Sequence, residues 1–192
     1  MHFYKKFKHL LCSVCLAFLF SVLSFSAWAE NVLLIKTAEL VAQDDAYELN
    51  ANVEAKFDRE VEEALLKGFE LHFILEFQLA SPIKYWFDDE IVTISYPITL
   101  GYHPLSRQFL ITEGDTQKSF SSLSEAANEF ASLRHIQVIK KAEVEKGETY
   151  KALLLVRLDQ KRLPKAIYEV SDKAATWEIK SQLFEWVPAV LK

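Results

Sequence analysis

The stretch FELHFILEFQL, residues 69–79, decides the fold that we expect for this chain. Every odd position in it is Phe or Leu, whereas Glu70, His72, Glu76 and Gln78 lie at even positions. Successive side chains of a β-strand point to opposite faces, so this alternation is typical of a strand with one face on a core and the other in water. Such half-buried strands usually belong to antiparallel sheets.

Four further segments show the same period of two. Residues 47–57 carry apolar side chains at the odd positions, and residues 92–102 carry them at the even positions. Residues 150–158 and 177–183 repeat the alternation more weakly. Three strong segments in one chain predict a structure built mainly from antiparallel strands.

Two short helices are expected between the strands. Asp58 is a good N-cap for the first helix, and Gly68 is suited to end it. Ser122 and Glu125 have the spacing of a capping box at the start of the second helix. The apolar face expected for this second helix contains Leu123, Ala126, Phe130 and Leu133.

These elements define the expected fold class. Their order is strand, strand, helix, three strands, helix and then three or four strands. The four glycines, at positions 68, 101, 114 and 147, fall at segment ends, where a positive φ is useful. No repeat or linker divides the chain, so we expect one β-rich domain over residues 30–192. Its class is β-rich α+β: an antiparallel β-sandwich or a strongly curved sheet with two short helices packed against it.

Residues 1–29 have the layout of a secretory signal peptide. Three lysines precede an apolar run over residues 10–25, and small residues then stand where a cleavage site requires them. We therefore expect cleavage between Ala29 and Glu30 and a periplasmic or secreted protein. The alternative is an uncleaved leader that anchors the domain in the inner membrane, because the apolar run approaches the roughly 20 residues that span a bilayer.

The composition of the mature chain excludes several classes of partner and site. The leader holds three of the 22 basic residues and none of the 27 acidic ones, so the rest carries a net charge of −8. An acidic surface is a poor partner for nucleic acid or anionic lipid, so we expect neither as a partner after cleavage. Both cysteines, Cys12 and Cys15, lie in the leader, which excludes disulfides and thiolate sites from the mature chain.

The segment GYHPLSRQF, residues 101–109, brings His103, Ser106 and Arg107 close together in sequence. Pro104 presets the φ of a tight turn and Ser106 can hydrogen-bond the backbone, so a hairpin corner explains these residue types. A catalytic interpretation needs an acid to orient the histidine, and no nucleophile elbow is present. We expect Arg107 to begin a strand beside an aromatic-rich sheet, where its guanidinium is a candidate clamp for a carboxylate.

The three mature histidines are widely spaced along the chain, at His72, His103 and His135. No two of them have the spacing of zinc ligands, so we expect neither a metal site nor a cofactor. His72 is expected on the polar, solvated face of its strand. His135 is expected just after the second helix, where a cation is favourable.

The acidic run at residues 88–90 and the neighbouring Trp86 are a second candidate cluster. Three consecutive acids lack the ligand spacing of a calcium loop, and Asp favours turns, so we expect a solvated hairpin turn. Trp86 falls on the polar face of the preceding strand, where it is either an anchor for a binding partner or a side chain beneath a helix.

Three stretches together resemble a known family. They are GYHPLSRQF, the pair Leu158-Asp159 with Leu163-Pro164-Lys165, and Trp177 with Ser181 and Trp186. In this order they resemble the exported bacterial proteins grouped as domain of unknown function 4390, over roughly residues 47–186. Phe109 departs from the pattern, because that family usually has a tyrosine there. The resemblance implies an envelope location and a link to envelope signalling, with no established activity, catalytic residue or cofactor.

Each residue shared with the family also has a structural interpretation. Asp159 can cap a short turn after a buried strand, and Pro164 fixes the entry to the next segment. Trp177 and Trp186 are nine positions apart, so they face opposite sides if they share one regular strand.

No catalytic constellation stands out, which favours a binding protein over an enzyme. We expect an exported, periplasmic, non-catalytic binding or adaptor domain that recognises an envelope protein or peptide through a sheet surface or edge. The first alternative is an envelope hydrolase in which Asp88, Asp89 or Asp159 has a raised pKa in a concave pocket and Arg107 clamps the substrate. The second is the membrane-anchored domain with residues 1–29 retained.

Overall fold

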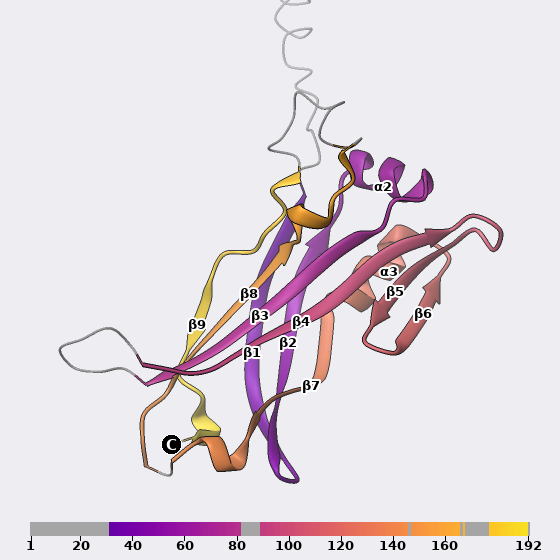
Figure 1. Ribbon diagram of the computed structural model, residues 1–192. Helices are drawn as coiled ribbons and strands as arrows, with labels where there is room; N and C mark the ends of the chain where they lie inside the picture. Colours follow the sequence, from indigo (N-terminus) through magenta and orange to yellow (C-terminus); the bar gives the residue numbers. More distant parts are fainter. Residues whose placement is uncertain (1–30, 82–88, 146, 166, 168–176, 192) are drawn as a thin grey trace, which may run out of the picture.

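The structure is a computed structural model that describes residues 31–81, 89–145, 147–165, 167 and 177–191. Trp86, Asp88, Ala29 and Glu30 lie outside the described residues, so the expectations placed on them stay predictions. The described chain forms two antiparallel sheets and two short α-helices (Figure 1). The β-rich α+β class expected from the sequence is therefore confirmed.

The larger sheet has six strands. In spatial order they are β6 (Thr116–Phe120), β5 (Gln108–Glu113), β4 (Asp89–His103), β3 (Leu71–Ser81), β8 (Lys151–Leu158) and β9 (Phe184–Trp186). The stretch that begins at Phe69 supplies β3, which lies inside this sheet between β4 and β8. All five odd-numbered side chains of β3 from Leu71 to Leu79 are fully buried, as their alternation predicted.

The smaller sheet has three strands in the order β1 (Val32–Gln43), β2 (Ala46–Lys56) and β7 (Ser132–Lys140). A bulge interrupts β1 between Ile35 and Thr37, and two register shifts interrupt the pairing of β2 with β7. The inner faces of the two sheets contribute to one hydrophobic core, in which Leu49 and Val53 of β2 join Phe73 and Leu75 of β3. The two sheets therefore pack face to face.

Both helices begin where the sequence predicted. In α2 (Arg59–Leu66), the Asp58 side chain accepts a hydrogen bond from the Val61 N–H at 2.9 Å, and Gly68 follows the helix with φ +88°. In α3 (Leu123–Phe130), the Ser122 hydroxyl accepts from the Glu125 N–H. The Glu125 carboxylate accepts from the backbone N–H of Ser121 and not from that of Ser122, as a capping box would require. Only the first of the two capping-box hydrogen bonds is therefore formed.

The start of the described chain is fixed to the N-cap of α2. The Asp58 N–H donates to the Asn31 side-chain oxygen at 2.7 Å, and the Asn31 amide donates back to the Asp58 carboxylate at 3.0 Å. Val32 follows at once and pairs with Lys56 in the first rung of β1 and β2. The two sheets and α2 therefore meet at the end of the molecule where the described chain begins (Figure 1).

An aromatic cluster connects the two sheets with α3. Phe57 follows β2, Phe73 lies on β3 and Phe130 ends α3, and their ring centroids are 5.0 to 6.0 Å apart. Phe73 and Phe130 are fully buried. Such tilted and edge-to-face contacts add to the stabilisation that burial alone provides.

Several local expectations were wrong. Four strands rather than three separate the helices, because β6 is an exposed edge strand without an apolar face and gave no alternation signal. Leu133 belongs to β7 and not to the second helix. Gly101 lies inside β4 opposite Leu110 and has no positive φ, so it does not mark a segment end.

His135 and the acidic run also lie elsewhere than expected. His135 is inside β7, with φ +58° and its ring 2.9 Å from the Glu48 carboxylate, so it does not cap a helix. Asp89 and Glu90 are the first residues of β4, paired with Ser81 and Ala80, because the pairing with β3 extends past the alternating region. These two acids are not part of a turn.

The C-terminal segment is less regular than its alternation suggested. Residues 177–183 form only an isolated bridge through Lys180, and β9 begins at Phe184. Trp177 is buried, and Trp186 packs against Phe77 with ring centroids 6.1 Å apart. Both tryptophans contact the same core. No regular strand connects them, so the condition under which they would face opposite sides is not met.

We predict that Phe73→Ala lowers the free energy of unfolding by about 3–5 kcal/mol, because it leaves a cavity where three elements meet. Urea denaturation of the purified protein measures this change. Leu105→Ala is the control, since Leu105 is 92% exposed at a hairpin tip and its removal should change stability by about 0.5 kcal/mol or less. Similar values for the two variants would show that the aromatic cluster does not support the core.

Candidate functional site

The segment GYHPLSRQF is a hairpin corner, as its turn residues predicted. β4 and β5 pair up to His103 and Gln108. The His103 Nδ1 lies 3.0 Å from the Ser106 hydroxyl and accepts from the Ser106 N–H at 3.2 Å. Both residues are exposed at the turn, so the imidazole closes the turn on its own backbone rather than activating a nucleophile.

Arg107 lies at the end of this turn and does not begin a strand. It adopts φ +55° and is exposed, and β5 starts one residue later at Gln108. The backbone has to reverse direction here, so a strand conformation is excluded at this position. The role of Arg107 as a carboxylate clamp stays a prediction.

A line of polar side chains crosses the outer face of the larger sheet. The His72 Nδ1 lies 3.1 Å from the Thr99 hydroxyl on β4, and the His72 Nε2 lies 3.9 Å from the Glu70 carboxylate. Burial lowers the pKa of His72, and the positive charge of Arg162 adds to this effect. His72 is thus half-buried, not fully solvated as its polar face suggested.

This line resembles a hydroxyl–imidazole–carboxylate relay, but its surroundings do not suit acyl transfer. Thr99 faces His72 on one side and Thr112 on the other, and the backbone C=O of His72 accepts from the Asp159 N–H. The neighbouring backbone groups are therefore used by the sheet and cannot form an oxyanion hole. The hydrogen bond between His72 and Thr99 is better explained as a stabilising pair between two strands.

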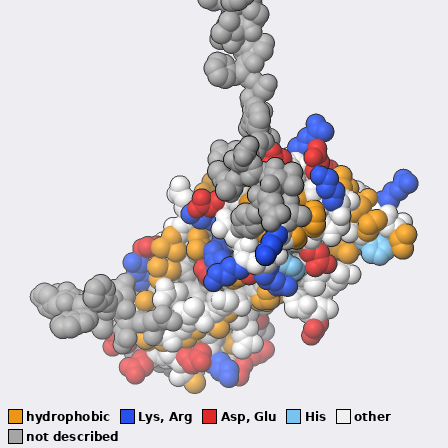
Figure 2. Space-filling view, turned by 45° about the horizontal axis from the view of Figure 1, so that its top comes forward, with side chains coloured by type: hydrophobic (Ala, Val, Ile, Leu, Met, Phe, Trp, Pro, Cys, Tyr) orange, Lys and Arg blue, Asp and Glu red, His pale blue; other side chains and the backbone are white. Residues whose placement is uncertain are grey.

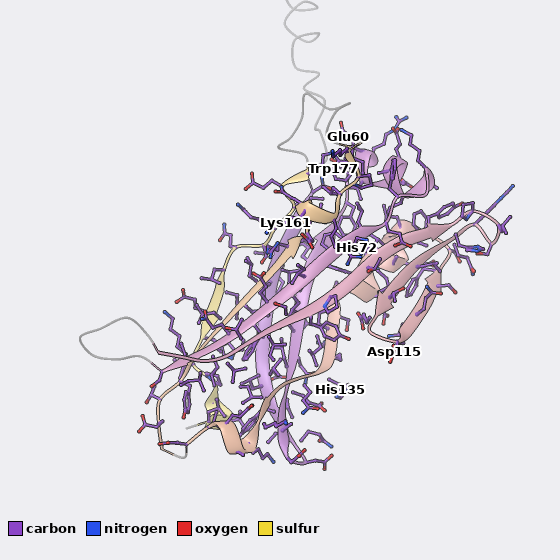
Figure 3. The ribbon with its side chains drawn as sticks, viewed as in Figure 1. Glu60, His72, Asp115, His135, Lys161 and Trp177 are labelled. Atoms are coloured by element: carbon purple, nitrogen blue, oxygen red, sulfur yellow. The ribbon has the colours of Figure 1, made fainter. Side chains whose placement is uncertain are left out.

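Two further polar groups on the same face have structural roles. The Arg157 guanidinium on β8 donates to the Glu76 carboxylate at 3.0 and 2.5 Å, and this bond raises the pKa of Arg157. The Asp159 side chain accepts from the Lys161 N–H and so caps a short 3-10 turn, as the sequence predicted. His72, Lys161 and Trp177 lie at the same end of the molecule, away from Asp115 and His135 (Figure 3).

The surface at the end of the molecule that carries α2 has no single sign of charge. Figure 2 looks toward this end and shows basic and acidic side chains on the same face. Within the described part of the chain, no three His, Cys, Asp or Glu side chains come close enough to hold a metal ion. No helix among the described residues is long and apolar enough to cross a membrane.

A groove lies between the end of β2 and the helix α3. Its volume is about 800 Å³. One wall is formed by residues 53–57, and the other by residues of α3 and its flanks, with Glu62 of α2 at the rim. The residues of the second wall are Ser122, Leu123, Ser124, Ala127, Asn128 and Ala131. Volumes of this order are typical of ligand-binding sites.

The groove exists because β2 extends further than its neighbour β7. β7 begins at Ser132, opposite Asn52, so no strand of the described chain pairs with this side of residues 53–56. The Val53 N–H still donates to the Ala131 C=O at 2.8 Å. The Ala131 N–H donates instead to the Ala127 C=O at the end of α3. The second hydrogen bond of an antiparallel pair, from the Ala131 N–H to the Val53 C=O, is therefore not formed.

The backbone of β2 therefore points hydrogen-bonding groups into the groove. Amide direction alternates along a strand, so Ala55 faces the same side as Val53. The C=O of Val53 and both backbone groups of Ala55 are directed toward α3. The opposite wall includes the small side chains of Ala127 and Ala131 beside Leu123 and Asn128.

A carboxylate beside the groove, that of Glu54, is paired with two lysines. Glu54 is paired with Lys36 at 2.7 Å and with Lys56 at 2.5 Å. The hydrogen bond from Lys36, followed by that from Lys56, lowers the pKa of Glu54 to about 2. Glu54 therefore remains ionised over the whole range in which proteins usually work.

A third group of titratable side chains connects α3 with the hairpin of β5 and β6. Lys118 forms an ion pair with Glu129 on α3, and half-buried Glu113 lies near both. Burial raises the pKa of Glu113; Lys118 opposes this effect and Glu129 adds to it. Burial also raises the pKa of Tyr96, which is close to Glu113.

The sequence did not predict the groove. Ala55 and Ala127 fit the apolar faces of a strand and a helix equally well, so their residue types carried no signal of an exposed site. The groove depends on the position at which β7 begins relative to β2, and strand pairing cannot be read from a single strand. The one sequence feature close to the groove was the end of the apolar–polar alternation between residues 57 and 58.

The comparison with known families gives one result. A family model described as domain of unknown function, DUF4390, matches residues 30–187. The chain therefore belongs to this family, as the motifs quoted above suggested. No curated protein and no solved structure matches the chain. Membership assigns no activity, so the function has to be argued from the site.

We predict that His103→Ala and Ser106→Ala each change the free energy of unfolding by about 1 kcal/mol or less, because both residues serve an exposed turn. Thermal or urea denaturation checks this. A well-folded His103→Ala variant that had lost the function of the protein would contradict the structural interpretation of the hairpin.

We also predict that Glu113→Gln is more stable, relative to the wild type, at about pH 7 than at about pH 4. The folded-state pKa of Glu113 is raised, so its contribution to stability is complete below the pKa of the unfolded chain and is lost as the pH rises through the folded-state value. The effect should be small because the group is only half-buried. Urea denaturation at both pH values measures it.

Asp115→Asn controls for the loss of one negative charge, because Asp115 lies at the exposed turn of the same hairpin. A Glu113→Gln variant whose relative stability fell between about pH 4 and about pH 7 would have the wrong sign for a raised pKa.

Proposed function

We propose that this chain is an exported, non-catalytic binding domain that recognises a protein or peptide of the cell envelope through an exposed edge of its sheets. The observation that carries this proposal is the edge of β2 at residues 53–56, on the side of β7, which has hydrogen-bonding backbone groups beside a groove and no strand of the described chain paired with it. Exposed strand edges are templates for pairing with another chain.

Two features of the sequence support the same proposal. The layout of residues 1–29 supports export, and the acidic mature chain favours a polypeptide partner over nucleic acid. The polar groups on the large sheet have structural partners, as with Arg157 and Glu76, which leaves less reason to propose catalysis. A link to envelope signalling is part of this proposal.

Site-specific photocross-linking in the native host tests the proposal. A photoreactive amino acid is introduced at one position on each of three edges: Leu34 on β1, Ser119 on β6 and Asn128 beside β2. The control position is Leu105, at the tip of the hairpin away from these edges. We expect at least one edge position to give a discrete cross-linked species that mass spectrometry identifies and that the control lacks.

The absence of any discrete species at all three edges would contradict the proposed function. An equal cross-linking pattern at Leu105 and at the edges would also contradict it, because the contacts would then be nonspecific. Circular dichroism of each purified variant confirms that the substituted protein is folded.

A further inference from the structure

We infer that the groove between β2 and α3 is the site that takes the partner, and that its occupant is an extended peptide segment with small side chains. This inference rests on the proposed function and specifies its site. The segment adds to β2 as an antiparallel strand along the line of β7, beyond the point at which β7 turns into α3.

The backbone groups of β2 carry the first part of the argument. β7 makes its last rung with β2 through Asn52 and Ser132. Just beyond it the Val53 N–H donates to the Ala131 C=O, but the Ala131 N–H donates within α3, so only one of the two hydrogen bonds of a further rung is formed. The C=O of Val53 and the N–H and C=O of Ala55 then point into the groove. This sequence of acceptor, donor and acceptor matches the backbone of an extended chain, as in other cases of strand addition.

The shape of the groove carries the second part. Three of its lining residues are Ala55, Ala127 and Ala131. Ala131 is held beside the free edge by its hydrogen bond with Val53, so a strand at the usual spacing of about 4.8 Å from β2 has little room for large side chains there. Side chains of the bound segment that point inward must therefore be small, such as Gly, Ala or Ser. An α-helix, about 10 Å wide with its side chains, could not reach the same backbone groups.

The remaining side chains of the occupant point outward, toward the outer face of the small sheet. There they meet Lys56 and Glu54, one of each charge, and the second lysine at Lys36. This surface offers partners to either sign of charge, so we expect the segment to be selected by its small inward residues and by its backbone more than by net charge.

The other free edges lack this combination. β6 is exposed from Thr116 to Ser119, and its Lys118 forms an ion pair with Glu129 of α3. β1 has exposed apolar residues at Leu34 and Val41, and it lies near the C-terminal turn at residues 189–191. Of the three edges compared, only that of β2 at residues 53–56 faces a groove that is lined in part by alanines.

Two substitutions at alanine positions test the site. Ala55→Pro removes the N–H that faces the groove and leaves the pairing with β1 intact, because that N–H points away from β1. Ala42→Pro is the matched control: Ala42 is also an alanine of the same sheet, and its N–H points away from β2 at the opposite edge. Ala127→Trp fills the groove from the other wall.

The probe is a displayed library of random linear peptides, selected on the purified mature protein. We expect selected peptides to have small residues at alternate positions. We expect their Kd to rise by about tenfold or more on Ala55→Pro and on Ala127→Trp, and to change by less than about twofold on Ala42→Pro. In the best peptide, N-methylation of successive amides should weaken binding at every second position, because only alternate amides face β2.

The possible outcomes separate this inference from the proposed function. A partner found by cross-linking at Leu34 or Ser119 whose binding is unchanged in Ala55→Pro would keep the proposed function and overturn the groove as its site. Peptides that bind Ala127→Trp as well as the wild type, or no selected peptide at all, would also overturn the inference. Loss of binding to Ala42→Pro together with Ala55→Pro would indicate general destabilisation of the sheet and would count against it as well.

Discussion

The contact of Phe57, Phe73 and Phe130 is the interaction on which the other parts of the structure depend. Phe73 belongs to the large sheet, Phe57 follows the last residue of the small sheet, and Phe130 ends the helix α3. Because α3 is held at its C-terminal end by Phe130, the chain must turn sharply into β7 at Ala131. That turn ends the ladder beside β2, so the packing of three rings also determines where an unpaired strand edge exists.

The sequence predicted the elements better than it predicted their connections. The alternation in β3 and the caps at Asp58 and Ser122 depend on neighbours within a few residues, and these expectations were confirmed. β6 was missed because an exposed edge strand needs no apolar face. His135 was misplaced because its bulge in β7 is stabilised by Glu48, which is 87 positions away in the sequence.

The same difference applies to the candidate sites. The hairpin of His103 and Ser106 could be predicted, because both partners of its hydrogen bonds lie within the turn. The groove could not, because Ala55 and Ala127 come from a strand and a helix more than 70 residues apart. Arg107 and the acidic residues at 88–90 were candidates because of their residue types alone. The groove is lined in part by alanines and by backbone groups, whose residue types carry no such signal.

The reciprocal hydrogen bonds of Asn31 and Asp58 have a consequence for the orientation of the molecule. They fix the point at which the chain enters the fold, one residue from Phe57 at the rim of the groove. Any segment attached before Asn31 therefore joins the described fold beside the groove, so a tether at this position also determines how the groove is presented.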